Sequence, residues 1–388
     1  MQIWQEVLII HSYISGSKME RKIKTIFVIT IIFLISLPII FFNSNQEISE
    51  KENRKLAEKP LLIKENHLNM NIFEEYDYYL QDHFGFRNQL IQLDAKNPLK
   101  TKSSTVIGSI GRAIEGKNGW YFFTDSTNGN NFLDFHKRNL LNYKQVEQLS
   151  ERIYKITEWC KEQNILFIFL IGPNKHSVYE EFYPYDRPEG ITRADQITKI
   201  FDELKVPYIF PRDFLISKKT EYDIPFYYET DTHWNPLGAY LVSTLIREKI
   251  ESFFPTKNFP KIEYETKIDY SMTFGDLLLI LGIEKSKSTQ PRLIPIGHDN
   301  ADYYEYLKNE GVNYVNTKGS DKNLPRALIF RDSFFYALEP FISPLFSNAE
   351  YRGKPFSDED KDYVLQYKPD IIIFESVERF APNIVKIE

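Results

Sequence analysis

The sequence contains little cysteine and no excess of positive charge. Cys160 is the only cysteine among 388 residues, which excludes an intrachain disulfide and leaves no paired cysteines for a metal site. Because a buried cysteine behaves as a small hydrophobic residue, we expect Cys160 to be a packed thiol on a helix. The net charge of -6 argues against nucleic-acid binding, which usually depends on a basic surface.

Histidine is also scarce, and internal repeats and low-complexity tracts are missing. The 7 histidines are scattered, without HxxxH spacing or a recurring histidine–carboxylate cluster, so the sequence predicts no metal site. Hydrophobic residues make up 42% and aromatic residues 15% of the chain, which is enough to form a substantial core. A wholly disordered protein is therefore excluded.

Charge is absent from one long run near the N-terminus. Thr25 to Phe42 reads TIFVITIIFLISLPIIFF, and a transmembrane helix needs about 20 apolar residues, with about 17 as the lower end. Basic residues precede this run and acidic residues follow it, which predicts a cytoplasmic N-terminus and an extracytoplasmic remainder. A buried core helix is disfavoured because the run has no polar face.

A cleaved signal peptide is the main alternative to a retained anchor. The apolar run closes with Phe41-Phe42-Asn43 and lacks the small-residue pattern of a cleavage site, so we favour an uncleaved anchor. Both Met1 and Met19 stay open as the start of translation. We expect a cytoplasmic tail at 1–24, the anchor at 25–42, a polar tether at 43–66 and a catalytic domain at 67–388.

The catalytic domain shows alternating helical and strand-like patterns. Continuous apolar runs predict strands buried on both faces, as in a parallel sheet, and amphipathic stretches between them predict helices. This alternation indicates an α/β fold with helices on both faces of a mostly parallel sheet. The expected strands are 165–171, 208–210, 327–330 and 370–374, and the expected helices are 141–163, 191–204, 236–254 and 358–367.

Binding sites of such sheets form beyond the carboxyl ends of the strands, and Ser333 lies three residues past one of them. A serine hydroxyl becomes a useful nucleophile when a base accepts its proton. His233 is the candidate base, and Asp231, two residues earlier, can orient the imidazole and stabilise its charged form. In an extended segment both side chains leave the same face. Taken singly, these residues also fit a helix cap and a loop acid.

Several segments in combination resemble a known family. TDTHWNPLGAY, followed about 100 residues later by LIFRDSFF, resembles the DHHW family with the alginate O-acetyltransferase proteins AlgJ and AlgX. ENRKLAEKP, DHFGFRNQLI, GKNGWYFF and GPNKHSVYEEFYP are similar to further segments of that family. The resemblance extends over nearly the whole exported part and implies an SGNH-hydrolase-like three-layer sandwich, in which Asp231, His233 and Ser333 match the catalytic positions.

The sequence departs from the family pattern at two positions. Arg331 stands where a GDSF-like block has glycine, which leaves the oxyanion geometry open, and Thr232 stands where DHHW has its first histidine. We expect Thr232 to point away from its neighbours. Asn174 is a candidate oxyanion donor or a turn residue, Arg331 a substrate contact or an ion-pair partner, and Trp234 a packing residue or a sugar-stacking platform.

The resemblance implies an extracytoplasmic serine O-acetyltransferase that acts on a cell-surface polysaccharide without a diffusible cofactor. Acetyl-CoA is not available outside the cytoplasm, so a membrane-bound O-acyltransferase is the expected acetyl donor. An acetyl-esterase with the same triad, and a non-catalytic glycan-binding or scaffold protein of an export complex, are the alternatives. The polymer, the acetylated hydroxyl and the oligomeric state stay open.

The predicted topology can be tested with a reporter that fluoresces only in the cytoplasm. Fused after Glu388, it is expected to stay dark, because the basic residues before the apolar run keep the opposite end of the chain inside. A bright fusion would contradict the predicted localisation.

Overall fold

The computed structural model describes residues 18–45, 48–49, 54–64, 67–69, 72–87, 112–125, 129, 131–273, 275–296, 302–311 and 313–385. Contacts divide the chain into two compact units, Met1–Leu99 and Lys100–Glu388. Residues 1–17 of the predicted tail and several residues of the predicted tether lie outside the described ranges. The domain boundaries expected at residues 24, 42 and 66 stay predictions.

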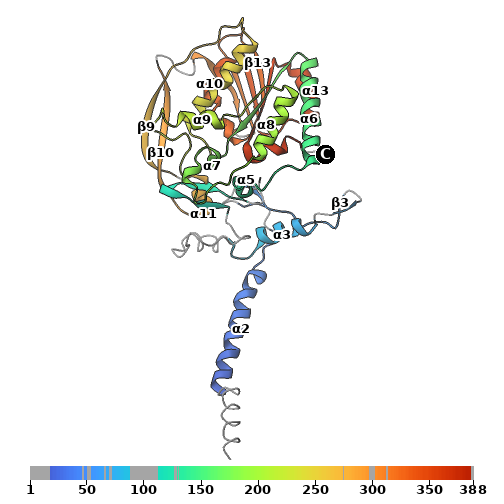
Figure 1. The fold of residues 1–388 in the computed structure, drawn as a ribbon, viewed down its shortest axis with the longest axis vertical. Helices are drawn as coiled ribbons and strands as arrows, with labels where there is room; N and C mark the ends of the chain where they lie inside the picture. Colours follow the sequence, from blue (N-terminus) through green and yellow to red (C-terminus); the bar gives the residue numbers. More distant parts are fainter. Residues whose placement is uncertain are drawn as a thin grey trace, which may run out of the picture. The chain divides into compact units, whose positions relative to one another are not determined.

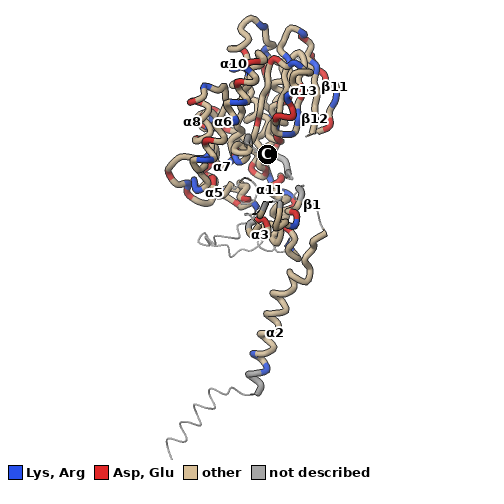
Figure 2. The backbone as a smooth tube through the Cα atoms, turned by 90° about the vertical axis from the view of Figure 1, so that its right-hand side faces the viewer, with Lys and Arg blue, Asp and Glu red and all other residues tan. Residues whose placement is uncertain are grey.

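The N-terminal unit contains a long apolar helix, α2, Lys18–Ile40. Within it, Lys22–Ile40 is long and apolar enough to cross a membrane, and its apolar side chains are exposed. Lysine and arginine lie only near its start (Figure 2). A helix of this kind near an N-terminus fits either a membrane anchor or a signal sequence, so retention of the helix stays a prediction.

The other described elements of this unit are short, and His83 joins two of its segments. Both ring nitrogens of His83, the last residue of helix α3, lie within hydrogen-bond distance of backbone carbonyls, Nδ1 of Asn43 O at 2.6 Å and Nε2 of Ala57 O at 2.9 Å. The elements are α3 (Ile72–His83) and the strand pairs β1 (Ile48–Ser49) with β2 (Arg54–Lys55) and β3 (Ile63–Lys64) with β4 (His67–Leu68).

A seven-stranded sheet forms the centre of the C-terminal unit (Figure 1). Five neighbouring strands are parallel, and β12 and β11 extend one edge in antiparallel fashion. The predicted α/β fold with a mostly parallel sheet is therefore confirmed. In spatial order the strands are β11 (Tyr304–Asn309), β12 (Tyr314–Gly319), β14 (Asn348–Arg352), β13 (Arg326–Phe330), β15 (Ile371–Val377), β7 (Leu166–Gly172) and β8 (Tyr208–Ile209).

Helices cover both faces of this sheet, which explains why the strands β7, β13 and β15 carry continuous apolar runs. In β7, Phe167 and Phe169 pack in one core cluster with helices α6, α8 and α13, while Ile168 and Leu170 pack in another with α9, α10 and α12. Cys160 is fully buried on α6, as predicted. The helices are α6 (Tyr143–Glu162), α8 (Arg193–Leu204), α9 (Arg212–Lys218), α10 (Pro236–Phe253), α12 (Glu339–Ile342) and α13 (Lys361–Tyr367).

The long helices and the strands β7, β8, β13 and β15 agree with the sequence prediction to within a few residues, whereas the strands β11, β12 and β14 and the exposed segments were missed. The clearest case is a long antiparallel hairpin, β9 (Tyr264–Thr273) with β10 (Ser286–Pro295), which encloses the short helix α11 (Asp276–Leu281). The described part of β9 is largely exposed, so it lacks the apolar pattern on which strand prediction depends. The smaller elements are β5 (Ala113–Glu115), η1 (Lys117–Gly119), β6 (Tyr121–Phe123), α5 (Asn131–Phe135), α7 (Lys175–Val178), η2 (Glu180–Phe182), η4 (Ser333–Ala337), η5 (Ser343–Leu345), η6 (Asp358–Asp360) and η7 (Glu378–Val385).

Asn235 joins the start of α10 to the loop before it. Its Oδ1 accepts hydrogen bonds from Leu237 N (3.0 Å) and Gly238 N (3.1 Å), and its Nδ2 donates to Pro225 O (2.6 Å). The side chain is fully buried. Water therefore cannot replace these bonds when the side chain is removed.

Asn235→Ala is expected to lower the free energy of unfolding by about 2 kcal/mol, since a helix cap and a buried hydrogen bond are lost together. Asn142→Ala removes the exposed cap of α6 and should cost only about 1 kcal/mol. Urea denaturation of the two variants checks the difference. Equal losses would show that burial of Asn235 adds nothing to its role as a cap.

Candidate active site

Parallel pairing brings the ends of three neighbouring strands to one edge of the sheet. Strand β15 pairs with β13 on one side and with β7 on the other, and Gly172 at the end of β7 lies opposite Val377 at the end of β15. The segments after these strands carry Asn174, Ser333 and Arg379. The edge predicted to hold the site is therefore where these residues lie.

Ser333 is the first residue of the 3-10 turn η4, and Asp332 caps that turn. The Asp332 carboxylate accepts from the backbone N–H of Phe334 (2.8 Å) and from that of Val377 (2.8 Å). The Asp332 N–H in turn donates to the carboxyl group of Glu375 (3.0 Å). These bonds tie the serine turn to the end of β15 and fix the direction in which Ser333 leaves the backbone.

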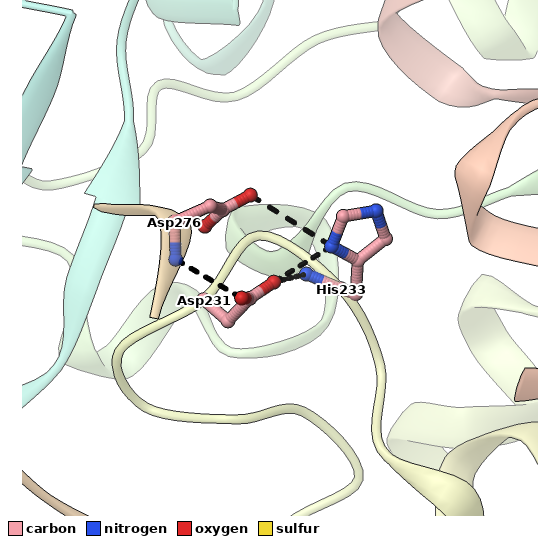
Figure 3. A group of neighbouring side chains, drawn as sticks. All are labelled: Asp231, His233 and Asp276. Carbon is pink, nitrogen blue, oxygen red and sulfur yellow. Dashed lines mark hydrogen bonds and ion pairs between the residues drawn. The ribbon is translucent and has the colours of Figure 1, made fainter. Parts of the chain in front are cut away.

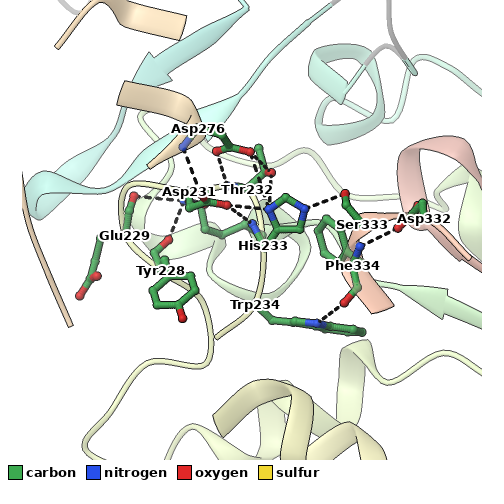
Figure 4. A network of polar contacts seen from close by, with 11 residues as sticks. Tyr228, Glu229, Asp231, Thr232, His233, Trp234, Asp276, Asp332, Ser333 and Phe334 are labelled. Carbon is green, nitrogen blue, oxygen red and sulfur yellow. Dashed lines mark hydrogen bonds and ion pairs between the residues drawn. The ribbon is translucent and has the colours of Figure 1, made fainter. Parts of the chain in front are cut away.

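The structure brings Ser333, His233 and Asp231 into one hydrogen-bonded line (Figure 4). His233 Nε2 lies 2.8 Å from Ser333 Oγ, and His233 Nδ1 lies 2.6 Å from Asp231 Oδ1. The imidazole therefore has one nitrogen toward the hydroxyl and the other toward the carboxylate. This is the geometry in which an imidazole can remove a proton from a serine.

A turn brings the side chains of Asp231 and His233 together. The prediction that they leave the same face of an extended segment is wrong. The chain bends at residues 231–233, and the His233 backbone N–H donates to Asp231 Oδ1 at 3.0 Å. Aspartate readily accepts a hydrogen bond from the backbone two residues later. One carboxylate oxygen thus holds both the backbone and the ring of His233.

The two partners shift each other's pKa. Burial disfavours the charged form of Asp231, but hydrogen bonds from His233, the charge of His233 and the Asp276 N–H lower its pKa to about 2. Burial likewise opposes protonation of His233, yet the bond to Asp231 and the charges of Asp231 and Asp276 raise its pKa above the usual value. Asp231 therefore stays ionised, and His233 is a stronger base than a free imidazole.

Trp234 packs beneath the histidine loop, which is the first of its two predicted roles. The indole is buried, and its Nε1 donates to Phe334 O at 2.8 Å. The ring of Phe334 contacts both Trp234 and His233, with centroid distances of 5.3 and 4.8 Å. The indole thus connects the histidine loop to the serine turn.

Arg331 points away from solvent and takes the ion-pair role. Its side chain is fully buried, and Nη2 lies 3.9 Å from Glu339 Oε2. The guanidinium also lies over the ring of Tyr336, 4.4 Å from the centroid. A side chain enclosed in this way contributes to packing beside the serine turn.

The side-chain amide of Asn174 has a donor, Nδ2, that is paired with no acceptor among the described residues. The side chain is 1% exposed, and its Oδ1 accepts from Arg379 Nη1 at 3.2 Å. The Asn174 backbone N–H donates to Glu378 Oε2 at 2.8 Å. A free amide donor after the central strand agrees with the predicted oxyanion role, which stays a prediction.

Thr232 contradicts the expectation that the middle residue of the motif points away. Its hydroxyl donates to Asp276 Oδ2 and lies 3.2 Å from His233 Nδ1. The bend at residues 231–233 removes the strict alternation of an extended segment, so three successive side chains face the same side. Thr232 is therefore part of the polar network around the imidazole.

Lys175 was missed in the sequence, although it stands in the GPNKHS segment. Its Nζ donates to three backbone carbonyls of the histidine loop, those of Tyr228 (3.0 Å), Glu229 (3.1 Å) and Asp231 (2.7 Å). The side chain is 5% exposed. All three ammonium hydrogens are thus used to hold the loop that carries Asp231 and His233.

Asp231, His233 and Asp276 form a group that is close enough to hold a metal ion. Their ligand atoms lie within 4.8 Å of one another and face one another (Figure 3). The group escaped the sequence analysis because Asp276 comes from the distant β9–β10 hairpin. A metal on Nδ1 would displace the proton shared with Asp231, whereas the serine chemistry needs that proton in place. The prediction that the protein uses no metal stays a prediction.

The fold is that of an SGNH-hydrolase-like domain, and the comparisons agree. The family model described as the SGNH hydrolase-like domain, acetyltransferase AlgX, matches residues 113–311. Because the match spans just over half of the chain, the protein belongs to this family, and the resemblance predicted from the sequence is confirmed. Ser333 lies beyond the matched range. No curated protein sequence matches the chain.

Two solved structures of PatB1 support the same fold. The structure of Bacillus cereus PatB1 has 15% identity and a TM-score of 0.52 over 70% of this chain and 97% of PatB1. PatB1 with sulfonyl adduct has 16% identity and a TM-score of 0.50 over 68% and 96%. The O-acetyltransferase domain of Pseudomonas putida AlgJ has 18% identity and a TM-score of 0.44 over 70% and 93%. At such identities the PatB1 likeness shows the fold alone.

The lowered pKa of Lys175 should make the free energy of unfolding depend on pH. Burial lowers its pKa to about 7, against the opposing charges of Asp276, Asp231 and Glu229, whereas an unfolded lysine titrates at about 10.4. Between these values the unfolded chain binds the additional proton, so this group makes the free energy of unfolding rise with pH. Lys175→Met is expected to remove that rise, measured by urea denaturation at about pH 7 and about pH 10.

The same variant should lower kcat by roughly ten- to a hundredfold, because small misplacements of catalytic groups have effects of this size. Lys219→Met is the matched control, since Lys219 donates to the backbone of Val178 (2.7 Å) and not to the histidine loop. It should leave kcat and the slope between the two pH values unchanged. The assignment of Lys175 fails if both variants behave alike.

Proposed function

We propose that the protein is a membrane-anchored, extracytoplasmic serine O-acetyltransferase that transfers acetyl groups to hydroxyls of a cell-surface polysaccharide. The single observation that supports this most is the line from Ser333 Oγ through His233 to Asp231, in a chain of the AlgX-type acetyltransferase family. The family supports O-acetyl transfer in general. The polymer acceptor, the acyl-serine intermediate and the membrane anchor are parts of the proposal.

In the first half of the reaction Ser333 becomes acetylated. His233 Nε2 accepts the hydroxyl proton as Oγ attacks the acetyl carbonyl of the donor, and Asp231 stabilises the imidazolium that forms. The imidazolium then returns the proton to the leaving group of the donor as the carbonyl re-forms. The backbone N–H of Ser333 and the free Nδ2 of Asn174 are the donors proposed to face the oxyanion.

In the second half the acetyl group moves to the acceptor. A sugar hydroxyl gives its proton to His233 Nε2 and attacks the acyl-serine carbonyl. Collapse of the intermediate breaks the bond to Ser333 Oγ, which takes the proton back from His233. The product is an acetyl ester of the sugar, and the free serine is regenerated without any change in oxidation state.

The proposal places the donor in the membrane and the acceptor outside the cell. The apolar helix α2 supports a location at the membrane surface, where acetyl-CoA is absent, so a membrane-bound O-acyltransferase is the proposed partner. We propose no nucleic-acid partner and no diffusible cofactor. Each of these partners is inferred from the proposed location and from the resemblance to the family.

The test is the mass of the acyl-enzyme in the full-length chain in detergent. Incubation with a chromogenic acetyl ester should add about 42 Da to the peptide that contains Ser333, because acetyl replaces one hydrogen on the nucleophile. Addition of an acceptor oligosaccharide should accelerate loss of the adduct, whereas an esterase would lose it at a rate that ignores the sugar. Turnover should survive a metal chelator.

Ser333→Ala and His233→Ala should form no adduct. Ser333→Ala should keep a thermal midpoint near that of the wild type, because it opens no core cavity, whereas His233→Ala should lower the midpoint, because it leaves the Asp231 carboxylate without its ring partner. Ser217→Ala, on the exposed face of helix α9, serves as the matched loss of a hydroxyl and should acetylate normally, because Ser217 Oγ donates only to the Phe214 carbonyl of the same helix. An adduct on another residue, or equal turnover in Ser333→Ala, would falsify the proposed nucleophile and favour a glycan-binding or scaffold protein.

A further inference from the structure

The loop that carries Asp231 and His233 is joined to the β9–β10 hairpin by close backbone approach. A Cβ atom added to Gly275 would lie 1.8 Å from the carbonyl oxygen of Thr230. Only glycine allows this approach without displacement of one of the two segments. The short helix α11 therefore begins directly against the histidine loop.

A second connection lies at the start of β10. The carboxylate of Glu229 accepts hydrogen bonds from Ser288 Oγ, from Thr289 N (3.0 Å) and from Thr289 Oγ1 (2.7 Å). Glu229 is thus a loop acid that contacts the hairpin without contacting the imidazole. It offers a natural comparison for Asp276, an acid of the hairpin that lies beside the imidazole.

Asp276, the first residue of α11, contacts all three residues of the Asp231–His233 motif (Figure 4). Its backbone N–H donates to Asp231 Oδ2 at 3.0 Å, and its Oδ1 accepts from Thr232 N at 2.8 Å. Its Oδ2 accepts from Thr232 Oγ1 and lies 3.7 Å from His233 Nδ1. Asp276 thus contacts the backbone N–H of Thr232, the second carboxylate oxygen of Asp231 and Nδ1 of His233.

We propose that Asp276 is a second acid of this site, a positioning residue that orders the Asp231–His233 turn and places a second negative charge beside His233 Nδ1. The kinetic consequences rest on the proposed function, whereas the electrostatic ones depend on the geometry alone. Ser333 lies on the opposite, Nε2 side of the ring. Both carboxylates can therefore stabilise the imidazolium without blocking the reacting atoms (Figure 3).

The charges around His233 come from several elements. Asp231 and Asp276 favour its protonated form, while Arg379, from η7, disfavours it. Lys175, from α7, faces Asp231 and Asp276, and Asp332 and Glu375 face Arg379. Among the described residues, the charged groups within 4 Å of Nδ1 are these two carboxylates. In a partly desolvated site, charges at such distances interact more strongly than in water.

The coupling between Asp276 and His233 is reciprocal. Burial raises the pKa of Asp276 and the charge of Asp231 raises it further, whereas the charge of His233 lowers it. By linkage, a charged imidazole that favours the Asp276 carboxylate is itself favoured by that carboxylate to the same extent. Formation of the imidazolium during proton transfer therefore stabilises the pair of acids, which would otherwise repel each other.

Asp276→Asn tests this role, because it keeps the shape of the side chain and an acceptor for Thr232 N while it removes the charge. The pKa of His233 should fall, so the acid limb of the pH profile of kcat/KM should move to lower pH. We expect kcat to fall by roughly ten- to a hundredfold, while KM for the ester stays unchanged, since Asp276 lies on the side of the ring away from Ser333.

Glu229→Gln is the matched control. It removes a carboxylate that joins the same two segments. Glu229 is not one of the two acids beside Nδ1. The variant should lower the thermal midpoint and leave the acid limb in place. If Glu229→Gln shifts the limb as far as Asp276→Asn does, Asp276 acts only by holding the segments together, and the proposal is wrong.

A direct titration separates this proposal from the proposed function. Full-length Ser333→Ala protein with 13C-labelled histidine rings, in detergent, reports the pKa of His233 by NMR without any turnover, and His233→Ala identifies its signal. Asp276→Asn in this background should lower the pKa of His233. An unchanged pKa overturns the role of Asp276 even in an active acetyltransferase, whereas a lowered pKa in a protein that forms no acyl-enzyme supports Asp276 and rejects the function.

Discussion

Partial burial of the Asp231 carboxylate is the constraint on which the site depends. A charge removed from water is costly unless it is paired and its remaining lone pairs accept hydrogen bonds. Here one oxygen accepts from the backbone and ring of His233, and the other accepts from the Asp276 N–H. The free-energy cost of desolvating Asp231 is offset only when the histidine loop and the β9–β10 hairpin are both in place. The pairing of Asp231 with His233 therefore depends on the folded domain.

The serine side of the site depends on a different set of bonds. Asp332 links the turn after β13 to the end of β15, and Trp234 links that turn to the histidine loop. The nucleophile and the base are thus held by separate structural connections that meet at Phe334, whose ring and backbone contact the residues of the loop. A change in either connection alters the distance between Ser333 Oγ and His233 Nε2 without removing a reacting group.

Transfer and hydrolysis share the same acyl-serine, so the triad by itself does not set the outcome. The partition depends on whether a sugar hydroxyl or water reaches the ester carbonyl first, since either can give its proton to His233. A transferase must hold the acceptor close to Ser333 and in line with the carbonyl, because positioning alone can raise effective concentration by many orders of magnitude. The family supports transfer through its acetyltransferase members.

Local pattern in the sequence predicted the long helices and the strands β7, β8, β13 and β15, and together with the family resemblance it pointed to Ser333, His233 and Asp231 as the candidate nucleophile, base and acid. ILFIFLI, ALIF and DIIIF predicted buried strands because both faces of the sheet are covered, and parallel strands bring the segments after them to one edge, which located Ser333. The roles of Asp276, Lys175 and Thr232 were decided by tertiary structure. Asp276 reaches the motif from an exposed hairpin with no apolar period, Lys175 acts on backbone carbonyls that leave no trace in side-chain identity, and Thr232 turns inward because the chain bends. Hydrogen bonds between segments distant in the sequence depend on how the backbone is folded, and residue spacing along the chain carries no record of them.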